Sequence, residues 1–340
     1  WIDPASSMGS GASVQRASTW LALFAAACLV ALLGCDDYAI PLMHGEDLSI
    51  SVSPPASSAP APPPPVFVKA GRTKVRGHWM IVPEGLDARD GRYDLAIHFH
   101  GNPKVVEESY ALARIRAVLV IVNLGEGADR YSEAFPNPLR LRTIIQTVGE
   151  ELQSRGMSRP ELRRLALSAW SAGFGAIGEI IRQPEHRRAL DAVLLFDGLH
   201  ARYIPDTKRV EPVAVGPWVD LAKDAMKDQV LFLVTHSAIH PVNLEIAGVR
   251  ETINAVLDEV GVKRTKTEGR VRPRKLEAIR GVYSDKSLYE LNAQSVAVDK
   301  GLMVIEYDGN SPEHHIAHLL QMSQIGLPRL ALRWKRPPPR

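Results

Sequence analysis

One stretch of sequence decides the fold: Leu165-Ala166-Leu167-Ser168-Ala169-Trp170-Ser171-Ala172-Gly173-Phe174-Gly175. Its apolar first half predicts a buried strand, and the small residues that begin the segment 172–182 predict a helix. Ser171 stands between the two, on a turn so tight that the positions two before and two after it must be small. Ala169 and Gly173 occupy those positions. The stretch therefore predicts a strand, a tight turn and a helix.

Strands and helices alternate on both sides of this stretch. The uncharged apolar run 117–122 is typical of a strand that is covered on both faces. A helix is predicted over 138–153, because Asn137 is a good N-cap and Pro138 suits the first helical position. Further strands are predicted at 77–83, 95–100, 192–196, 230–234 and 302–307, and further helices at 242–260 and 316–325. This alternation predicts an α/β fold with a mainly parallel sheet and helices on both faces.

The serine turn resembles the nucleophile elbow of the α/β-hydrolase family, whose pattern is Gly-x-Ser-x-Gly. This chain has Ala169-Trp170-Ser171-Ala172-Gly173, so alanine stands in place of the first glycine. The resemblance covers about residues 69–332 and implies an α/β-hydrolase fold. It makes Ser171 the nucleophile, held on a strained backbone at a helix N-terminus. The alternative is a tight helix start that Ser171 merely caps.

The resemblance also implies an oxyanion hole, a pair of backbone N–H groups that stabilise negative charge on the substrate. One donor in the family is the residue after the serine, here Ala172. The second comes from a loop after an earlier strand. The matching loop reads His-Phe-His-Gly-Asn over 98–102, and its donor is Gly101 or Asn102. The residues expected at the binding site are Trp170 and His100, which either orients this loop or faces the substrate.

The general base that accepts the serine proton is expected after the last strand, near the C-terminus. The sequence has three histidines there, His314, His315 and His318. We choose His315, because it falls at the junction of loop and helix. His314 is the close second, and His318 is placed to pack along the helix. No metal site is predicted, since His314 and His318 could share a helix face but no further cluster of His or Cys supports one.

The third member of such a triad is a carboxylate that orients the histidine. In the family it commonly follows the strand expected here at 230–234, but the segment Thr235-His236-Ser237-Ala238 contains no acid. Asp197, at the carboxyl end of the preceding apolar strand and followed by Gly198, fits the alternative family position. We therefore assign this role to Asp197. A turn-initiating aspartate is the other interpretation.

The N-terminal segment is predicted to be a targeting signal that is not part of the folded domain. Residues 20–33 form an uncharged apolar run of 14 residues, which matches a signal-peptide core and is too short to span a bilayer. The run ends in Leu32-Leu33-Gly34-Cys35, which resembles a bacterial lipobox, and the resemblance implies lipidation of Cys35. An ordinary secreted protein and an uncleaved anchor are the alternatives. The expected division is a signal peptide at 1–34 (with 1–7 not native and Met8 the start), a Pro/Ser-rich tether at 35–65, the α/β-hydrolase domain at 66–333 and a basic Pro-rich tail at 334–340.

Composition narrows the classes of function further. The 340 residues are 45% apolar, carry a formal net charge of +3 and include two cysteines. These values exclude a wholly disordered chain and a disulfide scaffold, and they give no support to nucleic-acid binding. Residues 263–275 hold seven Lys or Arg residues. A solvated surface loop is expected there, and binding to an anionic surface is the alternative.

We therefore predict a serine hydrolase, a carboxylesterase more than a peptidase, that acts on a small ester-like substrate through Ser171, His315 and Asp197. The reaction passes through an acyl-enzyme and needs no cofactor. The expected location is the bacterial cell envelope, outside the cytoplasm, with the chain attached to a membrane through Cys35. The alternative is a binding lipoprotein that keeps the fold without turnover. The residues placed at the pocket rim are Arg130, Tyr131, Phe135, Tyr203 and Trp218.

Overall fold

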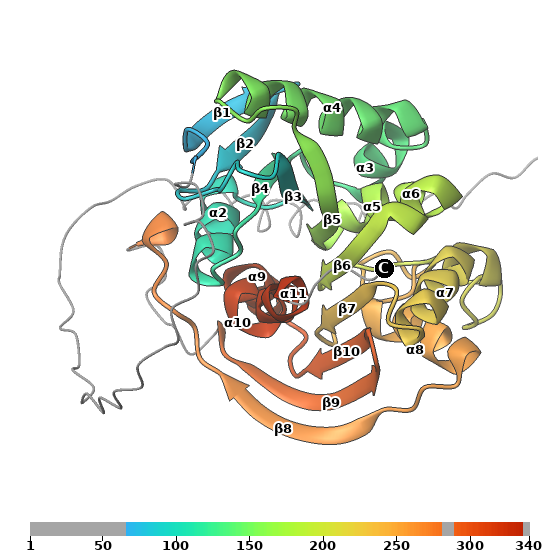
Figure 1. Ribbon diagram of the computed structural model, residues 1–340. Coiled ribbons are helices and arrows are strands. Elements are labelled where there is room, and N and C mark those ends of the chain that lie inside the picture. The colour runs from blue at the N-terminus through green and yellow to red at the C-terminus, as the bar shows by residue number, and fades with distance from the viewer. Residues whose placement is uncertain (1–65, 281–288, 336–340) are drawn as a thin grey trace, which may run out of the picture.

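The chain forms a ten-stranded sheet with helices on both faces, as the computed structural model shows for residues 66–280 and 289–335 (Figure 1). Along the sheet the strands follow the order β1-β2-β4-β3-β5-β6-β7-β10-β9-β8. The strands are β1 (Gly71–Val75), β2 (His78–Val82), β3 (Arg92–Phe99), β4 (Val118–Val122), β5 (Glu161–Trp170), β6 (Leu190–Phe196), β7 (Leu231–His236), β8 (Thr265–Val271), β9 (Leu291–Asp299) and β10 (Leu302–Tyr307).

The centre of the sheet is parallel. Strands β4, β3, β5, β6, β7 and β10 run in one direction, and antiparallel strands extend the sheet at both ends. The register aligns Phe99 with Ala169 and Trp170 with Phe196, so the carboxyl ends of β3, β5 and β6 meet at one edge. Open α/β sheets bind their ligands at this edge. The strand order and the strand–turn–helix at β5 confirm the predicted α/β-hydrolase fold.

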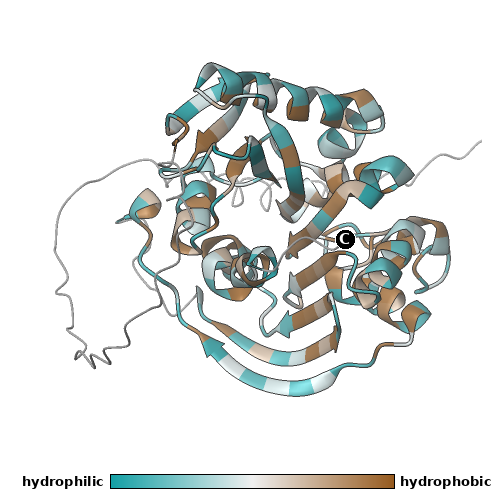
Figure 2. Cartoon of the chain, viewed as in Figure 1, coloured by the Kyte–Doolittle hydropathy of each residue, from teal (hydrophilic) through white to brown (hydrophobic). Residues whose placement is uncertain are grey.

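The helices cover the two faces of the sheet in two hydrophobic layers. One layer contains α4, α5, α7 and α8, and the other contains α2, α9, α10 and α11 (Figure 1). Strand β7 is hydrophobic and fully buried, whereas β8 is largely hydrophilic (Figure 2). The helices are α2 (Pro103–Leu112), α3 (Ala128–Ala134), α4 (Pro138–Ser154), α5 (Phe174–Ile181), α6 (Pro184–Ala189), α7 (Pro212–Met226), α8 (Val249–Val260), α9 (Pro312–Leu320), α10 (Met322–Ile325) and α11 (Leu327–Trp334), with 3-10 turns η2 (Ser171–Gly173) and η3 (Glu277–Ile279).

Local signals place the start of α4 correctly. The helix begins at Pro138, and the side-chain Oδ1 of Asn137 accepts a hydrogen bond from the backbone N–H of Leu139 at 2.9 Å. The last predicted helix, 316–325, corresponds to two helices in the structure. Helix α9 begins earlier, at Pro312, and ends at Leu320, and α10 begins at Met322.

Two predicted elements are wrong in the structure. The helix predicted at 242–260 begins only at Val249, because the preceding loop bonds to another loop: the backbone N–H of Ala247 donates to Ala201 at 2.9 Å. The basic segment 263–275, expected as a solvated loop, contains the edge strand β8. Its side chains stay largely exposed although its backbone pairs with β9, so its polar sequence did not reveal the strand.

The predicted signal peptide, Cys35 and the tether lie outside the described residues. Within the described ranges, no helix combines the length and apolar character that crossing a bilayer requires. At the other end, α11 includes Trp334, whose Nε1 donates to the side chain of Asp191 at 2.6 Å.

Candidate active site

The serine turn is held by close packing against the neighbouring strand. Ser171 follows β5 directly and has a φ of +49°, a left-handed conformation that is costly for a residue other than glycine. A Cβ on Gly173 would lie 2.2 Å from the carbonyl oxygen of Phe99, so only glycine fits there. The turn thereby sets Ser171 at the carboxyl edge of the sheet.

The side chains of Ser171, His315 and Asp197 lie within hydrogen-bonding distance in a row. His315 Nε2 is 2.8 Å from Ser171 Oγ, and His315 Nδ1 is 2.8 Å from Asp197 Oδ2. His315 comes from the first turns of α9, and Asp197 directly follows β6. Because a carboxylate only accepts, Nδ1 donates to Asp197, and the neutral ring presents the lone pair of Nε2 to the serine. The arrangement can take a proton from the serine hydroxyl.

Asp197 is fully buried, and the loop after β7 holds it. Its φ is +48°, and a Cβ on the next residue, Gly198, would lie 2.2 Å from the carbonyl oxygen of Ser171. Ser237 donates its backbone N–H to Asp197 Oδ1 at 2.8 Å and its hydroxyl to Oδ2 at 2.9 Å. Burial disfavours the charged form, but the neighbouring histidines and the Ser237 N–H prevail and lower the pKa of Asp197 below its ordinary value.

Two further rings accompany that of His315. Trp170 donates from Nε1 to the backbone carbonyl of His315 at 3.0 Å. His100 stacks on Trp170 with ring centroids 5.2 Å apart, and its Nδ1 lies 2.9 Å from the hydroxyl of Tyr131. Burial, and to a smaller extent the repulsion that a protonated His315 would exert, lowers the pKa of His100 to about 4, so the His100 ring is neutral near pH 7. These contacts tie the loop after β3 to the serine turn.

The three residues expected to supply oxyanion donors lie in two turns at this edge. Ala172 is in η2, and Gly101 and Asn102 follow β3. Asn123 donates from Nδ2 to the carbonyl oxygen of Gly101 at 2.9 Å, which directs the N–H of the same peptide, that of Asn102, to the opposite side. In residues 66–280 and 289–335, neither the Gly101 nor the Asn102 N–H donates to a protein acceptor.

The other histidines lie in different surroundings. His314 turns back to its own loop, with Nδ1 2.8 Å from Ser311 Oγ. His318 is fully buried, as is His98 in β3, which makes a 2.7 Å contact with Ser168 Oγ. Among the described residues, no group of three or more His, Cys, Asp or Glu is placed to hold a metal ion.

Two residues at the site were not predicted in their observed places. Ser237 directly follows β7, where an acid was looked for in the sequence and not found. Its hydroxyl, which donates to Asp197, was the only feature of the sequence that could have indicated its role. Tyr131, placed at the rim in the prediction, is fully buried beneath His100. Phe135, which directly follows α3, and Trp218 of α7 are also buried in the core and not at a rim, because their rings pack on Phe99 of β3 and Phe232 of β7.

The sequence matches no protein-family model and none of the curated proteins. Among solved structures, it is similar to the ferric enterobactin esterase of Salmonella typhimurium, with 12% identity, a TM-score of 0.41 and coverage of 75% of this chain and 55% of that one. It is also similar to the enterobactin esterase of Shigella flexneri, with 12% identity, a TM-score of 0.40 and coverage of 81% of this chain and 61% of that one. An acylaminoacyl peptidase of Pyrococcus horikoshii has 14% identity and a TM-score of 0.31, and the match covers 58% of this chain and 36% of that one. This chain therefore spans less than two thirds of the length of these three neighbours.

Proposed function

We propose that the protein is a serine hydrolase of the carboxylesterase type. The observation that carries the proposal is the row of contacts from Ser171 Oγ through both ring nitrogens of His315 to Asp197, with 2.8 Å at each step. The row begins at a strained serine on the carboxyl edge of the sheet and ends at a buried, ionised carboxylate. A nucleophile, a base and a group that orients the base are the minimum that acyl transfer requires.

In the proposed mechanism, Ser171 Oγ attacks the carbonyl carbon of an ester while His315 Nε2 accepts the hydroxyl proton. The carbonyl electron pair moves onto its oxygen, which the backbone N–H groups of Ala172 and of Gly101 or Asn102 stabilise. The intermediate collapses, the bond to the leaving oxygen breaks, and His315 returns the proton to the departing alcohol. Water that is deprotonated by the same ring then attacks the acyl carbon, releases the acid and restores the serine.

Asp197 orients the His315 ring and stabilises its cation in both halves of this cycle. An ester is the proposed substrate because an alkoxide needs less proton assistance to leave than an amine does. The net charge of +3 gives no support to a polyanionic substrate. None of these steps uses a cofactor.

A fluorophosphonate probe tests this proposal, because such probes phosphonylate activated serines. The folded wild-type protein should form one adduct, on Ser171, and Ser171→Ala should form none. The matched control is Ser154→Ala, which removes an exposed hydroxyl at the end of α4 whose partner is the carbonyl of Glu151 at 2.8 Å. This control should be labelled at the wild-type rate. No adduct and no ester turnover in folded wild-type protein would instead support the alternative, a binding lipoprotein.

We also propose that the enzyme domain, 66–333, is tethered to a membrane of the bacterial cell envelope through a lipid on Cys35. The support is the sequence alone: an apolar run of 14 residues that ends at Gly34-Cys35, followed by the proline-rich segment up to residue 65. Expression with an alkyne-tagged fatty acid should label the wild-type chain and not Cys35→Ala. Equal labelling of the two would contradict the anchor.

A further inference from the structure

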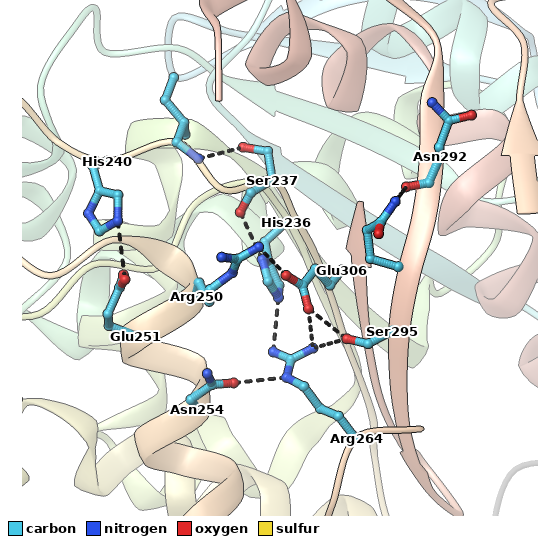
Figure 3. Close-up of polar contacts among 12 residues, drawn as sticks. His236, Ser237, His240, Arg250, Glu251, Asn254, Arg264, Asn292, Ser295 and Glu306 are labelled. Atoms are coloured by element: carbon cyan, nitrogen blue, oxygen red, sulfur yellow. Dashed lines mark hydrogen bonds and ion pairs between the residues drawn. The ribbon is translucent and has the colours of Figure 1, made fainter. Parts of the chain in front are cut away.

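The hold of Ser237 on Asp197 depends on a second histidine, which lies behind it. His236, the last residue of β7, is fully buried, and its Nδ1 lies 2.9 Å from the backbone carbonyl oxygen of Ser237 (Figure 3). A carbonyl only accepts, so this contact requires a hydrogen on Nδ1. In the other neutral tautomer, two lone pairs would face each other and the backbone of Ser237 would lose this support.

Arg264 selects the tautomer that this contact needs. Its Nη2 lies 2.9 Å from His236 Nε2, and a guanidinium has only donors to offer (Figure 3). Nε2 must therefore accept, which leaves the hydrogen on Nδ1. Burial, with a smaller effect of the Arg264 charge, lowers the pKa of His236 to about 4, so the ring is neutral near pH 7.

Arg264 is itself fixed by side chains of α8 and β9, and its Nη1 forms an ion pair with Glu306 of β10. Its Nε donates to Asn254 Oδ1 of α8 at 2.8 Å, and its Nη1 donates to Ser295 Oγ of β9 at 3.3 Å. Ser295 in turn donates to Glu306 of β10 at 2.6 Å, and Glu306 forms an ion pair with Arg250 of α8 (Figure 3). The guanidinium is thus a rigid group beside His236 and not a mobile surface charge.

We propose that Arg264 is a positioning residue of the active site, which acts through the tautomer of His236 to hold Ser237, and through Ser237 to hold Asp197 against His315. This inference rests on the proposed function. Arg264 touches no reacting atom, so its effect is on turnover and not on substrate binding. It also gives the strands beyond β10 a part in the site, because Ser295 of β9 and Glu306 help to fix the guanidinium.

The test compares variants by kcat and KM for p-nitrophenyl acetate and by the rate of fluorophosphonate labelling. Arg264→Met should lower kcat and the labelling rate about tenfold or more, since small misplacements of catalytic groups are costly, with KM within about twofold. Arg264→Lys keeps a donor for Nε2 and should recover most of the loss. The matched control is Arg155→Met, which removes another largely buried, ion-paired arginine, at the end of α4. It should leave kcat unchanged.

A second pair of variants tests the same chain of contacts with Arg264 in place. In His236→Asn the amide nitrogen can donate to Ser237 as Nδ1 does and has no alternative tautomer, so kcat should stay within about threefold of wild type. His236→Leu has no donor and should lose about tenfold or more. Adding Arg264→Met to His236→Asn should cost nothing further.

The outcomes separate this inference from the proposed function. If wild type hydrolyses the ester and is labelled, but Arg264→Met or His236→Leu keeps full kcat while folded, the positioning role is wrong and the hydrolase stands. If Arg264→Met lowers kcat as much in the His236→Asn background as in wild type, the positioning role is also overturned, since the effect would then not pass through the tautomer. If wild type neither reacts nor labels, the proposed function itself fails.

Discussion

At the scale of single residues, two glycines bring backbones into contact that side chains would hold apart. Gly173 lies under the end of β3, and Gly198 lets the loop after β6 cross the serine turn. In each case a Cβ would come within 2.2 Å of a carbonyl oxygen. Ser171 and Asp197 sit beside these crossings with positive φ values. The strain at Ser171 and Asp197 is therefore maintained by tight packing of the adjacent backbone.

Gly173→Ala is expected to destabilise the fold by about 3 kcal/mol, because the new methyl group must displace the carbonyl of Phe99 and no flexible side chain can move instead. Urea unfolding measures the change. Gly149→Ala in α4 is the control, since a Cβ there meets its neighbours only at 3.9 Å and beyond. It should stabilise the protein by up to about 1 kcal/mol through helix propensity. Equal midpoints for the two variants would contradict the packing argument.

At the residue level, the sequence selected Ser171 by its resemblance to a nucleophile elbow, His315 by its place after the last strand, and Asp197 by its place at the end of an apolar strand. The structure brings these three side chains together. Ser237 and Arg264 were out of reach. Neither belongs to a motif, and the distance between Arg264 and His236 depends on how the loop before β8 folds back.

At the scale of elements, β3 and β5 are joined by ion pairs as well as by the backbone hydrogen bonds of the sheet. Asp94 of β3 is 3% exposed and receives two hydrogen bonds each from Arg163 and Arg164 of β5, at 2.7 to 3.0 Å. Both arginines reach one carboxylate because the register shifts by one residue at Tyr93 and Asp94. The cluster fixes the start of the strand that carries the serine turn.

Asp94→Asn should cost about 3 to 5 kcal/mol, because it leaves the buried guanidinium of Arg164 without its counter-charge. The free energy of unfolding in urea checks this value. Asp90→Asn provides the comparison, since its pair with Arg92 is exposed at 3.3 Å and should contribute less than about 1 kcal/mol. Similar losses in the two variants would show that burial of the pair does not decide its strength.

Element prediction from sequence was accurate for the covered strands and poor for the exposed ones. An uninterrupted apolar run such as that of β4 has few other interpretations. In β8 the backbone pairs while most side chains face water, so its composition is that of a loop. The late start of α8 could not be read from the sequence either. The pattern of residues 242–248 suggests a helix, but the backbone N–H of Ala247 bonds to Ala201, in a loop distant in sequence.

At the scale of the whole molecule, buried neutral histidines make the fold sensitive to acid. Burial lowers the pKa to about 3 for His98 and to about 4 for His100, His236 and His318. In the unfolded chain these rings titrate near pH 6.5. Between those values the unfolded state binds more protons, so the stability that is fully present above pH 6.5 is lost as the pH falls toward 4.

His98→Asn isolates one of these contributions. The slope of unfolding free energy against pH, measured at constant ionic strength between pH 6 and 4.5, should fall by about 1.4 kcal/mol per pH unit, the value for one proton. The variant is less stable at pH 7, where it disturbs the 2.7 Å contact with Ser168, but it should lose less on acidification. An unchanged slope would show that His98 does not gain a proton on unfolding.

The two outermost strands have a consequence for the protein at high concentration. An unpaired strand edge can recruit a strand from a second molecule and start a continuous sheet. Here β1 exposes Arg72 and Lys74, and β8 exposes Lys266, Glu268 and Arg270, so both ends of the sheet carry exposed charged side chains. A second copy that paired with either edge would have to remove these charged side chains from water before the backbones could pair. The fold therefore resists aggregation at the two places where a ten-stranded sheet is most open to it.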